Sequence, residues 1–167
     1  PYPMEAIIGG VWEDPSNAHW LGTDMIGRDI LSRLLYGGQI TMLVALGASL
    51  IAFTLGSFFG LLTAVRGGWI DNVLSRIVDL MMAIPTLIVA LVLLSILTLN
   101  LWVPIVVIGV LDSTRVFRLS RAVAMDIAVM DYVEAAKLRG ERQNWVIFRE
   151  ILPNALTPII AEFGLRF

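Results

Sequence analysis

The sequence predicts an all-α protein, a polytopic bundle of helices that crosses a membrane at least four times. Apolar residues make up 57% of the 167 residues and the mean hydropathy is +0.81, whereas an ordinary soluble domain is about 45–50% apolar. Two segments, 34–65 and 80–111, contain no Asp, Glu, Lys or Arg, and each exceeds the roughly 20 residues that cross a bilayer. Lipid is therefore the expected surroundings of much of the surface.

Charge and reactive side chains exclude several other classes of protein. The net charge of −2 and the scattered basic clusters give no footprint for nucleic acid. The absence of cysteine excludes thiolate nucleophiles and disulfides, and the single histidine, His19, argues against a histidine-based metal site. The only lysine, Lys137, follows Ala136 and not glycine, so there is no P-loop. We expect no catalytic residue, bound cofactor or metal in this chain.

Residues 1–39 are expected to form an outward-facing loop and an interfacial helix that leads into the membrane. Prolines and a Gly9-Gly10 pair make residues 1–20 irregular. From Thr23 onward the apolar spacing favours a helix. Two oppositely charged pairs lie there at i,i+4 spacing: Asp24 with Arg28, and Asp29 with Arg33. No signal peptide is visible, and because the chain opens on Pro1, we expect a longer protein with further spans.

Residues 40–167 are expected to form the transmembrane core, truncated at its end. Its first span falls within 40–65, where Gly56 and Gly60 form a GxxxG pair that we interpret as helix packing. Gly67-Gly68 should end that helix, followed by a short connecting helix over 71–79. Three further spans are expected: 80–99, kinked by Pro85; 101–117, after a turn at Asn100; and one that starts within 151–167.

Two pairs of charged residues could mark either a transport pathway or a structural contact. Arg76 and Asp79 are i,i+3 neighbours at a membrane edge, so a structural pairing is favoured. Asp112 and Arg115 have the same spacing near the end of a span, and charges at that depth usually face a bundle interior or an aqueous cavity. For this second pair, the pathway and structural interpretations stay equally open.

The density of basic residues orients the bundle. Seven of the twelve Lys and Arg residues lie between Arg115 and Arg149, and none lies near Asn100. The positive-inside rule therefore makes the loop over 122–150 cytoplasmic and the N-terminal loop external. Within 122–150, Asp131 and Glu134 fit an N-cap and N3 pair, and Gly140 is a natural stop, which predicts a helix of about two turns.

A solvated connecting helix would account for this pattern, but the spacing of its residues indicates more. Glu134-Ala135-Ala136, then Gly140, then Ile151-Leu152-Pro153-Asn154 resembles the EAA loop of ATP-binding-cassette importer permeases. The resemblance implies that this helix is a coupling helix that docks on a partner ATPase. It implies coupling roles for eight residues: Asp131, Tyr132, Glu134, Ala135, Ala136, Gly140, Leu152 and Pro153.

Two further groups of residues, in the same order as in the family, resemble the dipeptide, oligopeptide and nickel importer permeases. The first is Leu21-Gly22-Thr23-Asp24, Gly27-Arg28-Asp29, Ser32-Arg33 and Tyr36-Gly37; the second is Gly67-Gly68, Asp71, Arg76, Asp79 and Pro85. Glu150 replaces a histidine that the family often has, and Leu111-Asp112 replaces Trp-Pro. Both departures lie outside the EAA pattern, but they leave open the local coupling contacts and the inner mouth of the pathway.

The family implies a multi-pass permease in a bacterial or archaeal plasma membrane that works with several partners. These are a second permease subunit, one or two cytoplasmic ATPases that use ATP and Mg²⁺, and a periplasmic or lipid-anchored solute-binding protein. Peptides are the first expected solute and nickel the second. Two other classes of protein are possible. An intramembrane enzyme is disfavoured, because a Ser-His-Asp triad would have to recruit His19 from the outer loop. A passive channel or membrane scaffold is the other alternative.

Overall fold

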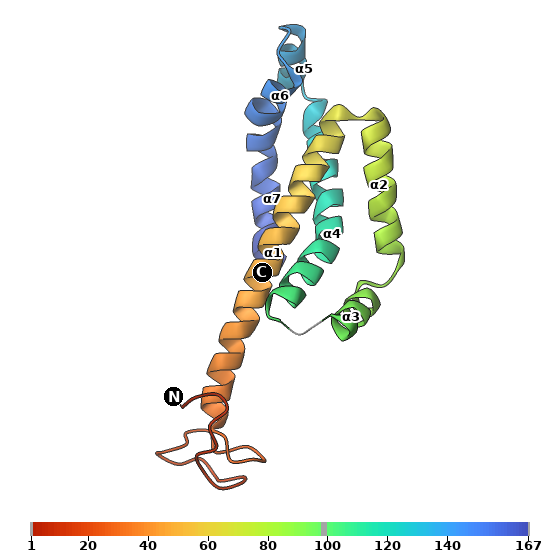
Figure 1. Cartoon of the computed structure of the whole chain (residues 1–167). Helices are drawn as coiled ribbons and strands as arrows, with labels where there is room; N and C mark the ends of the chain where they lie inside the picture. Colours follow the sequence, from red (N-terminus) through yellow and green to blue (C-terminus); the bar gives the residue numbers. More distant parts are fainter. Residues whose placement is uncertain (1, 98–99, 167) are drawn as a thin grey trace. The chain divides into compact units, whose positions relative to one another are not determined.

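The computed structural model of the chain, which describes residues 2–97 and 100–166, contains helices and no β-strand over those residues (Figure 1). The helices are α1 (Ile30–Arg66), α2 (Gly68–Ala83), α3 (Thr86–Ile96), α4 (Trp102–Ala128), α5 (Asp131–Leu138), α6 (Gln143–Val146), a π-helical segment (Ile147–Ile151) and α7 (Leu152–Arg166). The all-α prediction is confirmed. Two compact units divide at Val44 and Ala45, inside α1. We call them the N-terminal unit and the helical unit; the boundary predicted at residues 39 and 40 depends on where the membrane begins and stays a prediction.

The predicted interfacial helix from Thr23 is corrected by the structure, because the helix begins only at Ile30. Gly22 and Gly27 have φ angles of 76° and 78°, a left-handed conformation that an α-helix cannot include. Arg28 does pair with Asp24, but across a turn, at 3.0 Å between Nε and Oδ2. Arg33 also pairs with Asp24, so the predicted Asp29–Arg33 pair does not form.

The predicted helix end at Gly67 is confirmed, and the predicted kink at Pro85 is a complete break. α1 stops at Arg66 before Gly67 and Gly68, which both have positive φ. At Pro85, where a kink was predicted, α2 and α3 separate completely and their axes differ by 82°. Ile84 is extended there (φ −97°, ψ 132°), because the proline ring crowds the backbone of the preceding residue.

The turn predicted at Asn100 separates α3 from α4, with the Asn100 carbonyl accepting the Val103 N–H at 3.0 Å. α4 extends to Ala128, beyond the expected end of the span at residue 117, and so occupies the start of the predicted loop over 122–150. Over the described residues, α1 is long and apolar enough to cross a membrane, and the bent pair α2–α3 would make a second span. The count of four spans stays a prediction.

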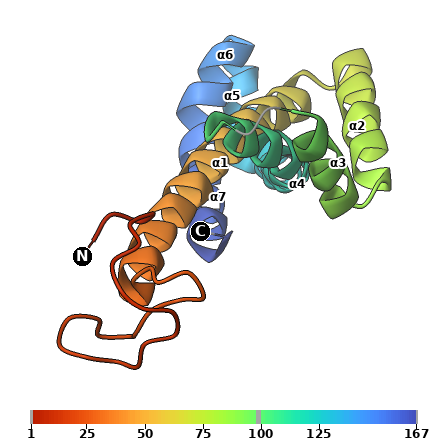
Figure 2. The same ribbon diagram turned by 60° about the horizontal axis from the view of Figure 1, so that its bottom comes forward.

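The helical unit packs α4 and α7 against the part of α1 that belongs to it (Figures 1 and 2). α1 and α4 meet through glycine: a Cβ on Gly56 would lie 2.6 Å from Val116 Cβ, and one on Gly60 would lie 2.8 Å from the Phe117 carbonyl oxygen. The interpretation of this GxxxG pair as packing is therefore confirmed within the chain. A buried apolar cluster joins the helix ends: Leu61, Ala124, Ile127, Val133, Ala136, Val146, Ile151, Ala155 and Ile159.

The prolines of the last helical stretch change its geometry without ending it. α7 continues through Pro158, and the π-helical turn Ile147–Ile151 lies directly before Leu152 and Pro153. A proline crowds the carbonyl one turn before it, and a wider turn relieves that clash. The Asn154 side-chain amide donates a hydrogen bond to the Glu150 carbonyl at 2.7 Å.

Candidate functional site

Helix α5 begins one residue earlier than the sequence predicts, because its N-cap is Met130 and not Asp131. Met130 is the N-cap, in an extended conformation, and no side chain caps the helix. The Met130 carbonyl accepts the N–H groups of Val133 and Glu134 at 2.9 and 3.1 Å. Asp131 therefore lies in the first turn, and the predicted Asp131–Glu134 capping box is wrong. Both acids still lie at the N-terminal end of the helix, where its dipole favours negative charge.

The predicted stop at Gly140 is confirmed, and the hydrogen bonds show how it works. Gly140 has φ 81°, and its N–H donates to the Lys137 carbonyl at 3.0 Å, while the Glu141 N–H donates to the Ala136 carbonyl at 3.3 Å. These are the two bonds of a Schellman motif, which closes a helix on a left-handed residue. The end of α5 is therefore fixed by backbone geometry.

The two alanines of α5 lie on different faces of the helix, one buried and one exposed. Val133 and Ala136 are fully buried in the cluster of the helical unit, whereas Ala135 is exposed. The resemblance implies a coupling role for both alanines, but only Ala135 is open to a partner, because Ala136 packs inside its own chain. The opposite face carries residues at i, i+3, i+4 and i+7 spacing, which lie together on a helix. We call these residues the exposed stripe: Asp131, Glu134, Ala135 and Leu138.

Two residues of the predicted set lie beside the exposed stripe, and two lie in α7. Tyr132 is exposed on α5, and Gly140 is exposed at its end. Leu152 packs partly against the buried cluster, whereas Pro153 is exposed. Sequence reasoning missed Leu138, which is 82% exposed. A large apolar side chain at i+3 from Ala135 was the available signal.

α5 is fixed to its neighbours by a hydrogen bond of Lys137 and by its buried side chains. Lys137 Nζ donates to the carbonyl of Ala128, the last residue of α4, at 3.3 Å, and a cation there also complements the helix dipole. Val133 and Ala136 share their cluster with Val146 and Ile151 from the following segments. Motion of α5 must therefore be passed to α4 and α7, because packed interiors resist local deformation.

Among the described residues, the two charged pairs considered near the membrane do not form ion pairs, but a different pair does. Neither Arg76–Asp79 nor Asp112–Arg115 is joined by an ion pair in the part of the chain that the structure describes. Arg121 of α4 instead donates from Nε and Nη2 to the two carboxylate oxygens of Asp71 in α2, each at 2.6 Å. Such a bidentate pair is the stronger form of a charged hydrogen bond.

The Asp71–Arg121 pair lines a pocket of about 540 Å³ together with Arg76 and Asp79. The structure thus brings two of the four predicted charged residues to one site. Asp112 is half-buried and Arg115 is exposed on α4, outside the residues that line this pocket. Sequence reasoning missed Arg121 because it lies 50 residues from its partner, and no local pattern links them.

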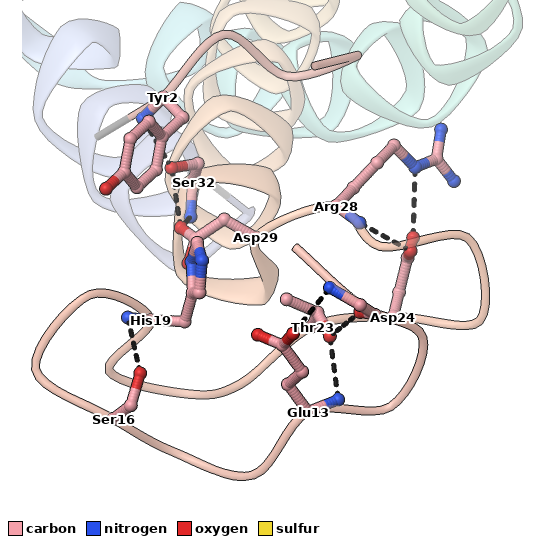
Figure 3. A network of polar contacts seen from close by, with 10 residues as sticks. Tyr2, Glu13, Ser16, His19, Thr23, Asp24, Arg28, Asp29 and Ser32 are labelled. Carbon is pink, nitrogen blue, oxygen red and sulfur yellow. Dashed lines mark hydrogen bonds and ion pairs between the residues drawn. The ribbon is translucent and has the colours of Figure 1, made fainter. Parts of the chain in front are cut away.

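The N-terminal unit contains a second polar arrangement, centred on buried Asp29 (Figure 3). One carboxylate oxygen accepts the hydroxyl and backbone N–H of Ser32 at 2.7 and 2.8 Å, and the other lies 3.2 Å from His19 Nδ1. The Ser32 hydroxyl in turn accepts the Tyr2 N–H at 2.8 Å. These bonds, led by the Ser32 hydroxyl, hold the pKa of Asp29 below its ordinary value.

This arrangement joins a serine, an aspartate and a histidine, but not in the order that activates a nucleophile. Ser32 donates its hydroxyl proton to Asp29, and His19 contacts the other oxygen of the same carboxylate. A hydrolase requires the histidine to accept the serine proton. The geometry supports a structural role, and no group of three or more metal-ligating side chains occurs among the described residues.

Comparison with known proteins places most of the chain in one family. Residues 52–167 match the family described as binding-protein-dependent transport system inner membrane component. A dipeptide transport system permease protein of Alkalihalophilus pseudofirmus is 36% identical over 155 residues, which cover 93% of this chain and 51% of that protein. A dipeptide transport system permease protein of Haemophilus influenzae is 38% identical over 160 residues, or 95% of this chain and 54% of the relative.

A third relative carries a different name. A glutathione transport system permease protein of Pectobacterium atrosepticum is 32% identical over 154 residues, which are 92% of this chain and 51% of that protein. The chain thus spans about half the length of these curated relatives. All three are named as permease proteins of transport systems. With the all-helical fold, the match over residues 52–167 shows that the chain belongs to the family of binding-protein-dependent transport system inner membrane components.

Proposed function

We propose that the chain is part of a permease subunit that imports di- or oligopeptides through a bacterial or archaeal plasma membrane, driven by a separate ATPase. The family match supports a transport role. Relatives named for dipeptide and glutathione transport support a peptide-like solute. Nickel or another small solute is the alternative within the resemblance to peptide and nickel permeases, and no described side-chain contact favours it.

The observation that carries the mechanism is the two-sided construction of α5. Its buried side is fixed to α4 and α7 through Val133 and Ala136, while the exposed stripe offers one small residue, Ala135, between charged and apolar neighbours. A partner groove can approach the backbone closely at a small side chain. Closure of an ATPase dimer that holds the stripe would then move α4 and α7 with α5 and alternate the access of the transport cavity.

The proposal includes an orientation for the chain. With the four spans that we expect, α5 and the Asp71–Arg121 pair would lie on the cytoplasmic side and the N-terminal unit outside, in line with the density of basic residues. ATP and Mg²⁺ would be bound by one or two partner ATPases. A second permease subunit would complete the pathway, and a periplasmic or lipid-anchored solute-binding protein would deliver the solute.

Bulk on the exposed stripe tests the coupling proposal. Ala135→Trp should abolish copurification of the ATPase and ATP-driven uptake in full-length permease that still folds and inserts, because the indole prevents close approach to the groove. Gln143→Trp is the matched control, since Gln143 is an exposed residue of α6 outside the stripe, and it should retain both activities. Normal ATPase association and uptake in the Ala135→Trp variant would exclude the stripe as the docking face.

Reconstitution separates the importer from a passive channel or scaffold. The full-length permease, its partner subunits and the solute-binding protein are placed in liposomes, and uptake of a labelled dipeptide is measured with and without ATP. Uptake that requires ATP and the ATPase supports the importer. Dipeptide flux that persists without ATP and the ATPase would instead establish a channel. Inhibition of dipeptide uptake by added nickel would indicate that nickel is the transported solute.

A further inference from the structure

Residues 10–13 of the N-terminal unit form a closed loop that presents two apolar side chains to solvent. Val11 is 61% exposed and Trp12 is 68% exposed. We call these two residues the tip. The loop beneath these side chains is closed by hydrogen bonds of Gly10 and Glu13.

Thr23 is the centre of this support (Figure 3). Its side chain is buried, its hydroxyl donates to the Gly10 carbonyl at 2.6 Å, and the same oxygen accepts the Glu13 N–H at 2.8 Å. The Glu13 carboxylate closes the loop from the other side by accepting the Gly10 N–H at 2.6 Å. Both residues that flank the tip are therefore fixed by side-chain hydrogen bonds.

The conformation of Trp12 shows that the support constrains the tip. Its φ is 56°, and it is the one residue other than glycine with a positive φ in the described part of the chain. A tryptophan rarely adopts this left-handed conformation, and such strain persists only where the surroundings impose it. Strained residues concentrate at sites that bind or switch, so the backbone that carries the exposed indole is held in one conformation.

The tip is also connected to the first turn of α1. The Trp12 N–H donates to the Asp24 carbonyl at 3.3 Å, and the Asp24 carboxylate pairs with Arg28 and Arg33. Arg33 belongs to α1. Asp24 therefore links the tip to α1, because its carbonyl accepts the Trp12 N–H and its carboxylate pairs with Arg28 and Arg33.

We propose that the tip is a docking element for the solute-binding protein, with the Trp12 indole inserted into an apolar socket of that partner. The inference rests on the proposed function, which places this unit outside the membrane. A rigid aromatic anchor suits a protein interface, because tryptophan dominates the energetics of many interfaces and a preformed loop loses little entropy on binding.

Charge identifies the kind of socket and favours a protein over a membrane. Three exposed acids lie in the segment that contains the tip, Glu5, Glu13 and Asp14, whereas the charge of Asp24 is paired with Arg28 and Arg33. Anionic lipid headgroups repel such a segment and attract basic ones. A socket rimmed by Lys or Arg would instead be drawn to it and oriented by it. Lipid also accepts an indole in many orientations and requires no clamped tip.

The experiment measures binding of the purified solute-binding protein to the complete transporter in nanodiscs. Trp12→Asn removes the indole but tolerates positive φ, and should raise the dissociation constant at least tenfold. Thr23→Val keeps the indole and removes the clamp, so it should weaken binding by a smaller factor. Trp69→Ala is the matched control: Trp69 is 77% exposed on α2, expected on the cytoplasmic side, and its loss should change binding less than twofold.

The outcomes separate this inference from the function on which it rests. If wild-type uptake requires the solute-binding protein but Trp12→Asn binds it as wild type does, the docking role of the tip is wrong and the importer stands. If brominated lipid in the nanodisc instead quenches the tryptophan fluorescence of the wild type more than that of Trp12→Asn, the tip contacts lipid and the inference is overturned. Wild-type uptake that does not require the solute-binding protein would overturn both the docking role of the tip and the proposed function.

Discussion

The N-terminal unit and the helical unit bury different chemistry. In the first, the buried side chains are polar, such as His19, Thr23, Asp29 and Ser32, and each makes hydrogen bonds. In the second, the buried cluster is apolar and the helices approach through glycine, while many large apolar side chains stay exposed. The first pattern suits a segment too short for an apolar core, stabilised by satisfied polar groups. The second suits helices in lipid, where close packing replaces the hydrophobic effect.

The largest expected effect comes from filling the contact between α1 and α4. Gly56→Leu should prevent the helical unit from folding, because even a Cβ at this position lies 2.6 Å from Val116. Gly56→Ala should lower the free energy of unfolding by about 2 kcal/mol through overpacking. A lower thermal midpoint of the detergent-solubilised protein would report this loss. Gly38→Ala is the control, since a Cβ there meets no atom within 4 Å; an equal loss in both variants would contradict the packing argument.

A smaller effect is expected from removing the acceptor at the centre of the N-terminal unit. Asp29→Ala leaves Ser32 and His19 without their partner and should cost about 1–3 kcal/mol. Hydrogen exchange should accelerate over residues 2–44 and stay unchanged over residues 45–97 and 100–166. Asp14→Ala, at an exposed acid of the same unit, should have little effect. Faster exchange throughout the chain would mean that the two units do not differ as described.

The smallest expected effect is a loss of stability in acid that is confined to the N-terminal unit. The pKa of Asp24 is held far below its ordinary value, first by the Arg28 backbone N–H and then by the Ile26 N–H and the Arg28 side chain, and that of Asp29 is also lowered. A lowered folded pKa adds stability that is complete above the unfolded pKa of about 3.9 and is lost as pH falls below it. The N-terminal unit should therefore loosen below about pH 4.

Hydrogen exchange, corrected for its intrinsic pH dependence, measures this loosening between pH 5 and pH 2.5. Asp24→Asn provides the comparison, because it removes the titrating carboxylate and should flatten the response of residues 2–44. A response of the wild type that is equally steep in the helical unit would assign the effect to other groups.

Local chemistry made several features of the fold predictable. Gly67, Asn100 and Gly140 end or separate helices as expected, because a left-handed residue or a polar break acts within one turn of the chain. The complete break at Pro85 was predictable from the same kind of rule, since a residue before proline is pushed to extended conformations. The orientation of Ala136 was also available, because Val133 and Ala136 are i,i+3 neighbours on one apolar face.

Contacts between distant residues were not predictable. Arg121 and Asp71 are 50 residues apart, and Thr23 closes a loop that begins at Gly10. Charge alone favoured a pairing of Arg76 with Asp79 and left the role of Asp112 and Arg115 open, and neither pair is joined by an ion pair among the described residues. Packing of α4 against α2 decides which partner Arg121 reaches, and a single sequence carries no record of that packing.

The bond between Lys137 and the Ala128 carbonyl has a practical consequence for spectroscopy. These 167 residues contain one lysine, and it lies at the junction of α4 and α5. An amine-reactive fluorophore on its Nζ would report from that junction without any cysteine having to be introduced. Acylation also removes the positive charge that closes the end of α4, so the label is at the same time a chemical perturbation of the joint that it observes.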